Sequence, residues 1–359
     1  MGHSGATPEL TIFNTSHSPD QISNTKFPYF IQPDCTVYAT GSMKKPMTNS
    51  SKAEFFIECK TCINQDPFIV YNKLPTSTEA KDSKTLSDLI SKRPRGPTAV
   101  LNIGQLTAYV IMQMGSQYRT HVFLVFILKC YARLFHWDHS GTVFTAPIYY
   151  NCDSHLFDFF ACYNYASPEA QGHDMTVSTP TPDEEWMART MLGLEASETL
   201  LTISMPNQGN TQELCRYVVC APVPDVRIPP GHSTCTSIIY NVQGKEHVLL
   251  KDTWWVDIPD ILPEGVVYGI LHNNGIPNVS HCSQAGDVGD NVYHATQTNQ
   301  LADKSWKPNI EFHLTPHWHY RLVLNDIGEN IDEFSKSKDM VTAVHAALIG
   351  KINHNSQIE

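Results

Sequence analysis

The chain has 359 residues, of which 41% are hydrophobic and 17% are charged, an ordinary composition for a globular protein with room for two domains. Residues 1–170 carry 14 Lys and Arg against 13 Asp and Glu, whereas residues 171–359 carry 11 against 23. The acidic second half is therefore a poor candidate for binding nucleic acid by charge alone, and the nearly neutral first half leaves that question open.

We expect neither a membrane span nor a signal peptide from the pattern of this sequence. The most apolar stretch, His121 to Leu128, has the length of a strand and not of a membrane span. The first ten residues lack the basic and apolar regions of a signal peptide, and the ten cysteines follow no disulfide framework. We expect an intracellular protein, cytoplasmic or nuclear, with no membrane partner.

The first half has the pattern of an α/β domain. Residues 1–26 are polar and rich in Ser, Thr and Asn, which predicts a flexible arm. The first domain is expected over residues 27–175, ending in a linker rich in Ser, Pro, Thr and Gly. Within it we expect strands over residues 27–38, 53–57, 121–128 and 133–136, a loop around a short helix over 74–98, and a helix over 99–114.

The second half has a different pattern, in which short strands alternate with turns. Residues 176–194 are expected to form a linker and a helix that starts near Asp183 with an acidic first turn. A second domain is expected over residues 195–359, with strands between 200 and 250 and one or two helices over 331–352.

Lys251 is unusual because it interrupts the apolar strand pattern Val248 to Leu250. A lysine in such a strand needs a partner that offsets its desolvation. Glu264, thirteen residues later, begins a helical apolar pattern and is the expected partner. Protein kinases hold nucleotide phosphates with a strand lysine that is paired to a helix glutamate. An isolated lysine in a strand is more often an edge or surface residue than a phosphate-binding one. The order of the neighbouring elements decides between these two interpretations of Lys251.

Those neighbouring elements follow in the order that a kinase amino-terminal lobe requires. A turn with Gly231 and Ser233 lies where a phosphate-covering hairpin would be. A strand that ends at Leu324 leads into Asp326 and Ile327, which suit a hinge. These residues, with Lys251 and Glu264, form the predicted ATP site.

Longer phrases in both halves resemble the fungal-type protein kinase family of mushroom-forming fungi (basidiomycetes). They are Leu250-Lys251-Asp252-Thr253-Trp254, Gly275-Ile276-Pro277-Asn278-Val279 and His319-Tyr320-Arg321-Leu322-Val323-Leu324, and in the first half Gln117-Tyr118-Arg119-Thr120-His121-Val122-Phe123 and His136-Trp137-Asp138-His139-Ser140-Gly141. The resemblance implies a serine/threonine-kinase-like lobe with the first helices of the second lobe, ATP as ligand, and a protein substrate or partner that the sequence does not identify.

The chain also departs from that family. A second glycine of the phosphate-covering turn is replaced by Ser233. The family continues into a His-Arg-Asp catalytic loop and an Asp-Phe-Gly metal site, and the residues from Lys251 to Glu359 contain neither. Without the base and the magnesium-binding aspartate we expect no phosphoryl transfer, and weak or undetectable nucleotide binding.

A second constellation lies in the first half. Pro33-Asp34 ends one predicted strand and Glu58-Cys59-Lys60 ends the next. Carboxylates at the ends of neighbouring strands can hold Mg²⁺, and an adjacent lysine can orient water and stabilise developing negative charge. The predicted metal ligands are Asp34 and Glu58.

This spacing resembles the PD-(D/E)xK nuclease fold, whose mixed sheet is that of restriction endonucleases. Gln105 and Tyr109, one helical turn apart, resemble the Gln-x-x-x-Tyr element of RecB-type nucleases. The resemblance implies Mg²⁺ and DNA as ligands and a catalytic set of Asp34, Glu58, Lys60, Gln105 and Tyr109.

Two alternatives to nuclease activity stay open. One is a non-catalytic interaction scaffold in which Lys60 merely pairs with Glu58. The other is zinc binding by Cys59 and Cys62, which is disfavoured because no second pair completes four ligands.

Overall fold

A computed structural model describes residues 7–20, 31–68, 97–207, 213–223, 231–256, 258–259, 261–289, 293–302, 304, 314–328, 334 and 336–358. The chain divides into two compact units. Unit 1 comprises Met1–Met175, Pro222–Ser233 and Asn291–His317, and unit 2 comprises Thr176–Ala221, Thr234–Asp290 and Trp318–Glu359. Within the described residues, no helix has both the length and the apolarity needed to cross a membrane.

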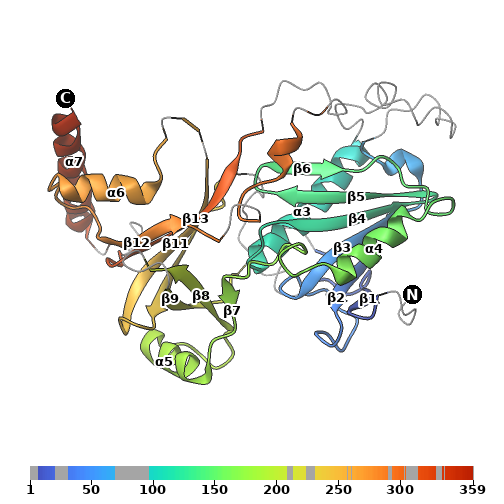
Figure 1. Ribbon diagram of the computed structural model, residues 1–359, viewed down its shortest axis with the longest axis horizontal. Helices are drawn as coiled ribbons and strands as arrows, with labels where there is room; N and C mark the ends of the chain where they lie inside the picture. Colours follow the sequence, from blue (N-terminus) through green and yellow to red (C-terminus); the bar gives the residue numbers. More distant parts are fainter. Residues whose placement is uncertain are drawn as a thin grey trace. The chain divides into compact units, whose positions relative to one another are not determined.

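Unit 1 is built on a mixed sheet with the strand order β1-β2-β3-β4-β5-β6 (Figure 1). Neighbouring strands are antiparallel except β3 and β4, which are parallel and are joined through α3. A parallel pair needs such a crossover connection. The elements are β1 (Leu10–Asn14), β2 (Cys35–Ala39), β3 (Ala53–Lys60), η1 (Ile63–Gln65), α3 (Pro97–Ser116), β4 (Val122–Leu128), β5 (Tyr131–Asp138), β6 (Gly141–Phe144) and α4 (His155–Tyr165).

Both faces of the unit 1 sheet are covered, which buries β3 on two sides. Phe56 packs with α3 residues such as Leu106 and Tyr109. Phe55, one position earlier and therefore on the opposite face, packs against α4 through Tyr163. Burial on both sides explains why β3 carries three consecutive apolar residues, Phe55 to Ile57, instead of alternating apolar and polar ones.

Helix α3 is fixed to the sheet by side-chain hydrogen bonds as well as by apolar packing. Gln113 donates through Nε2 to the carbonyl oxygens of Ala53 (2.9 Å) and Glu54 (2.7 Å) at the start of β3. Since Gln105 and Tyr109 precede Gln113 by about two turns and one turn, they lie over the later residues of β3. The helix therefore aligns its polar residues with the end of that strand.

The predicted flexible arm is wrong for part of its length. Leu10–Asn14 forms β1, which pairs along its length with β2, and Leu10 is in the core of unit 1. The alternation of Leu10 and Ile12 is short and lies in a polar region, so its strand character depends on a partner distant in sequence. The predicted loop over residues 74–98 lies outside the described residues except at its end, where α3 begins at Pro97.

Unit 2 contains a sheet with the order β12-β13-β11-β10-β9-β8-β7 (Figure 1). The predicted linker at 176–194 belongs to this unit, where it forms β7 and α5. The elements are β7 (Val177–Ser178), α5 (Pro182–Leu192), β8 (Leu200–Pro206), β9 (Leu214–Cys220), β10 (Cys235–Asn241), β11 (Glu246–Val256), α6 (Glu264–Asn273), β12 (Cys282–Asp287), η3 (Thr298–Leu301, in unit 1), β13 (His317–Leu324) and α7 (Ser337–Ile358).

Helix α5 forms where the sequence predicts a helix near Asp183, and both of its ends are capped. The side chain of Thr181 accepts a hydrogen bond from the amide of Glu184, and Glu184 bonds back to the amide of Thr181. Gly193 ends the helix in the left-handed conformation with φ of 64°. Ala188 of this helix packs with Val218 and Tyr240, so α5 covers the β8–β10 part of the sheet.

Helix α6 approaches the sheet of unit 2 very closely at Gly265. A Cβ at this position would overlap the Cβ of Ala285 and the hydroxyl oxygen of Tyr320. The amide of Gly265 donates to that same hydroxyl at 3.1 Å. The absence of a side chain therefore sets the distance between the first turn of α6 and strands β12 and β13.

Candidate functional site

The carboxylates of unit 1 meet because β2 and β3 are paired in a defined register. Asp34 directly precedes β2, so the prediction that it ends a strand is wrong. Cys35 lies opposite Ile57 in the antiparallel pair, and extending this register by one residue places Asp34 opposite Glu58, near the end of β3. Opposed residues of an antiparallel pair point to the same face, with Cβ atoms about 5 Å apart. The sheet thus brings together the two predicted metal ligands.

Glu58 is contacted by two other predicted site residues. The ammonium of Lys60 lies 2.5 Å from its Oε1 atom. The hydroxyl of Tyr109 donates to its Oε2 atom at 3.0 Å. Both oxygens of the Glu58 carboxylate therefore have a protein partner. The residue is buried, with only 2% of its surface exposed.

Gln105 closes the arrangement. Its Oε1 atom accepts a hydrogen bond from Lys60 Nζ at 3.1 Å, and its Nε2 atom donates to the Tyr109 hydroxyl at 2.7 Å. Gln105 and Tyr109 can contact each other because they are one turn apart on α3. Glu58, Lys60, Gln105 and Tyr109 form a closed ring of hydrogen bonds, which we call the Glu58 ring.

The electrostatics of the ring favour an added cation. Burial raises the pKa of Glu58, and the negative charge of Asp34 raises it further, while the bonds from Lys60 and Tyr109 offset only part of this. Burial and the Glu58 carboxylate also raise the pKa of Tyr109, which keeps its hydroxyl protonated as a donor. A divalent cation between Asp34 and Glu58 would relieve the repulsion between them.

Asp34 is itself held in place by the end of β3. Its Oδ2 atom accepts a hydrogen bond of 2.7 Å from the amide of Cys59. The carbonyl of Gln32 lies 3.0 Å from the Tyr109 hydroxyl, so the chain just before Pro33-Asp34 also reaches the ring. Gln32 is not among the predicted site residues, because a backbone carbonyl leaves no signal in the residue type.

The donor set suits a hard cation. Mg²⁺ is bound in proteins through one or two carboxylates plus water and substrate oxygens, and Asp34 with Glu58 provides such a pair. For the zinc alternative, Cys59 and Cys62 do not join any cluster of three or more candidate ligands within the described parts of the chain. The geometry therefore gives zinc no support.

Unit 2 brings together the predicted lysine and glutamate. Lys251 lies on β11 in the interior of the sheet, and its Nζ atom is 2.5 Å from Oε2 of Glu264, the first residue of α6. The two side chains are 26% and 36% exposed, so solvent or a ligand can reach the pair. The close approach of α6 at Gly265 places Glu264 within reach of the strand.

The other residues of the predicted ATP site lie in different settings. Leu324 is buried in the apolar cluster shared by β13 and α6. Asp326 accepts hydrogen bonds of 2.9 Å from the hydroxyl of Ser280 and the amide of His281, and Ile327 is 39% exposed. The bonds to Ser280 and His281 also lower the pKa of Asp326.

Gly231 and Ser233 group with unit 1, whereas Lys251 belongs to unit 2. The amide of Gly231 donates to the carbonyl of His139 at 2.8 Å, and the Ser233 hydroxyl lies 3.1 Å from His139 Nδ1. This differs from the predicted phosphate-covering hairpin, and the reason is that these residues find partners in the β5–β6 turn. We therefore leave them out of the candidate nucleotide site.

Part of the phrase that resembles the kinase family has a structural role. Asp252 is buried, and its carboxylate accepts hydrogen bonds from His319 Nε2 (2.6 Å) and Arg321 Nε (2.7 Å). Burial opposes the ionised form, but the charges of Arg321 and His319 and their hydrogen bonds together outweigh it and lower the pKa of Asp252. These residues hold β11 and β13 together on the sheet face opposite to Lys251.

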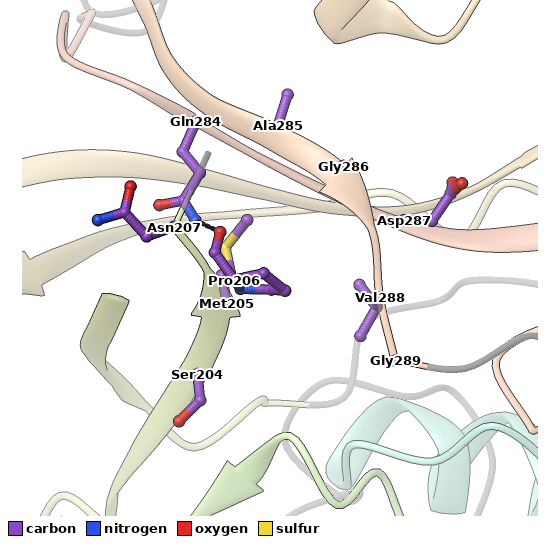
Figure 2. Close-up of a pocket in the computed structure, with 10 residues that line it drawn as sticks. All are labelled: Ser204, Met205, Pro206, Asn207, Gln284, Ala285, Gly286, Asp287, Val288 and Gly289. Carbon is purple, nitrogen blue, oxygen red and sulfur yellow. Dashed lines mark hydrogen bonds between the residues drawn. The ribbon is translucent and has the colours of Figure 1, made fainter. Parts of the chain in front are cut away.

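A small cavity of about 150 Å³ lies elsewhere in unit 2, between the end of β8 and β12. It is lined by residues 204–207 and 284–289, and Figure 2 shows Gln284 reaching across it to the carbonyl of Pro206. Ligand pockets usually have volumes of about 300–1,000 Å³, so the cavity is small for a cofactor. Lys251 and Glu264 are not among its lining residues.

Comparison with known proteins adds no further assignment: no family model, no curated protein and no solved structure matches this chain.

Proposed function

We propose that unit 1 is a Mg²⁺-dependent nuclease that hydrolyses phosphodiester bonds of DNA. The observation that carries this proposal is that the Asp34 carboxylate, bonded to the amide of Cys59, acts electrostatically on Glu58, which Lys60 contacts at 2.5 Å. The parallel β3–β4 pair with a crossover helix that carries Gln105 and Tyr109 supports it.

Asp34 and Glu58 would hold the cation, which when bound polarises a phosphodiester oxygen and acidifies a water molecule. Lys60 lies next to Glu58, so its ammonium can orient the attacking water and stabilise negative charge on the phosphate. Gln105 and Tyr109 fix the positions of Lys60 and Glu58 through the Glu58 ring. Water adds to phosphorus, the P–O bond to the leaving sugar oxygen breaks, and that oxygen takes up a proton.

The test is cleavage of supercoiled plasmid and of a labelled DNA duplex by the full chain in Mg²⁺ or Mn²⁺. Asp34→Asn, Glu58→Gln and Lys60→Ala are each expected to reduce cleavage at least 100-fold. Asp158→Asn removes an exposed carboxylate of α4 in the same unit and serves as control. Wild-type protein that cleaves no DNA, or variants that cleave as well as the control, would refute the proposal. DNA binding without cleavage would identify a scaffold instead.

A second proposal concerns unit 2, which we infer to be a protein-kinase-like lobe that retains the nucleotide-contacting pair but no phosphoryl transfer. The 2.5 Å contact between Lys251 and Glu264 favours it, because kinases pair a strand lysine with a helix glutamate. The order of a lysine strand, helix, two strands and a further helix, seen in β11, α6, β12, β13 and α7, also supports it.

The test is titration with a fluorescent ATP analogue together with a radiolabelled phosphate-transfer assay. We expect weak binding, reduced by Lys251→Ala, and no transfer to the chain or to generic protein substrates. Mg²⁺-dependent autophosphorylation that Lys251→Ala abolishes would contradict the predicted inactivity. Nucleotide binding that is the same in wild type and Lys251→Ala would contradict the role of the lysine.

A further inference from the structure

Thr15, directly after β1, is a fully buried polar residue next to the candidate metal ligands of unit 1. None of its surface is exposed. Its hydroxyl donates to the carbonyl of Pro33 at 2.8 Å and lies 3.0 Å from the hydroxyl of Thr36. Its amide donates to the carbonyl of Asp34 at 2.9 Å.

These bonds hold the two consecutive peptide units around Asp34. Thr15 supplies the donor for the carbonyl that precedes Asp34 and for the carbonyl of Asp34 itself. Pro33 has no amide hydrogen, so it cannot be held in the sheet through a donor of its own. The position and direction of the Asp34 backbone therefore depend on the two hydrogen bonds that Thr15 donates.

The side chain of Asp34 is fixed from the opposite side. Its Oδ2 atom accepts from the amide of Cys59, which lies between Glu58 and Lys60 on β3. A displaced Asp34 backbone would pull the carboxylate away from this amide and from Glu58. The contact between Cys59 and Asp34 is thus a local measure of how well the carboxylate pair is preorganised.

We propose that Thr15 is a positioning residue of the carboxylate pair, fixing Asp34 at the distance from Glu58 at which both can bind one divalent cation. This inference rests on the proposed function of unit 1. It gives residues 10–15 a role in the site, because β1 places Thr15 against β2 through its pairing. Binding by a preformed pair avoids the ordering cost that a mobile carboxylate would add.

Thr15→Val removes the hydroxyl at nearly constant volume and tests the inference in the full chain. Thr11→Val is the matched control, because Thr11 is on the same strand and its hydroxyl meets that of Thr40 at an exposed position. Two quantities are measured, the affinity for Mn²⁺ by calorimetry and the hydrogen exchange of the Cys59 amide without metal.

We expect Thr15→Val to weaken Mn²⁺ binding roughly 10-fold and to accelerate exchange of the Cys59 amide by a similar factor, since a buried carbonyl loses its donor. Other amides of β3 should keep their exchange rates, and Thr11→Val should behave as wild type. Thr15→Ser retains the hydroxyl and should keep the wild-type Mn²⁺ affinity and Cys59 exchange rate. If Thr15 acted only through packing, the smaller serine would not keep them.

The role of Thr15 and the proposed function of unit 1 can be refuted separately. Unchanged Mn²⁺ affinity in Thr15→Val, with wild type binding the ion, would overturn the inference and leave the proposed function intact. Wild-type protein that binds no Mn²⁺ would remove the proposed function and the metal role of Thr15. In that case, unchanged Cys59 exchange would also refute the anchoring of Asp34. Thr15→Ser that loses both properties would overturn the role of the hydroxyl.

Discussion

The double substitution Asp34→Asn with Glu58→Gln is expected to abolish the stabilisation of unit 1 by divalent cations. In wild type the two carboxylates repel each other at the ends of paired strands, and burial raises the pKa of Glu58. A cation that binds only the folded state adds about 2.7 kcal/mol to the free energy of unfolding when its concentration is 100 times its dissociation constant. For a unit of this size the midpoint of thermal unfolding should rise by roughly 5–10 °C.

The pH dependence provides a second criterion for the same prediction. Because the pKa of Glu58 is raised on folding, the folded state holds this proton more tightly than the unfolded state, and ionised Glu58 lowers stability at high pH. Protons also compete with the cation for the carboxylate. The gain from Mn²⁺ should therefore be largest near pH 8 and shrink as the pH falls toward the raised pKa, above the ordinary value of 4.5.

The assay is thermal unfolding of the full chain in EDTA and in a Mn²⁺ series at several pH values. Asp158→Asn is again the control, because its carboxylate is exposed on α4 and should leave the gain unchanged. An equal gain in the double variant would place the cation elsewhere and refute the reasoning about Asp34 and Glu58. A gain that does not change between pH 8 and pH 5 would contradict the competition at Glu58.

Three further predictions follow from contacts in the two units. Gly265→Ala should lower the free energy of unfolding by about 1–3 kcal/mol and weaken binding of the ATP analogue, because α6 must move away from β12. Gly269→Ala on the same helix has open space at its Cβ and should be neutral or stabilising in chemical denaturation. Glu264→Gln should reduce binding of the analogue as much as Lys251→Ala, because the ion pair orients the lysine. Wild-type affinity in Glu264→Gln would contradict this. Burial would raise the pKa of Glu54, but the hydrogen bond from His173 and the other partners of Glu54 lower it to about 2. Ionised Glu54 should therefore add roughly 3 kcal/mol to the free energy of unfolding at pH 7, and this stability should be lost as the pH falls from 4.5 toward 2. In urea unfolding, Glu54→Gln should lack this pH dependence.

Local patterns in the sequence were sufficient to predict much of the candidate sites. The α3 helix could be predicted because Leu106, Val110 and their neighbours recur at helical spacing, and this spacing also places Gln105 and Tyr109 on one side. Lys251 and Glu264 could be paired because a lysine in an apolar strand needs a nearby carboxylate. In each case the signal is contained in a short stretch of the chain.

Contacts between distant segments were decided only by the tertiary structure. Leu10–Asn14 becomes a strand because β2 offers a partner, and Thr15 then reaches Pro33 and Asp34. Gly231 and Ser233 join unit 1 through His139, although they precede the lysine strand in sequence. The sequence by itself determined which residue types can bind a cation or pair with a charge, because these depend on local chemistry. Strand pairing and buried hydrogen bonds join residues far apart in the chain, so only the folded structure decides which of them meet.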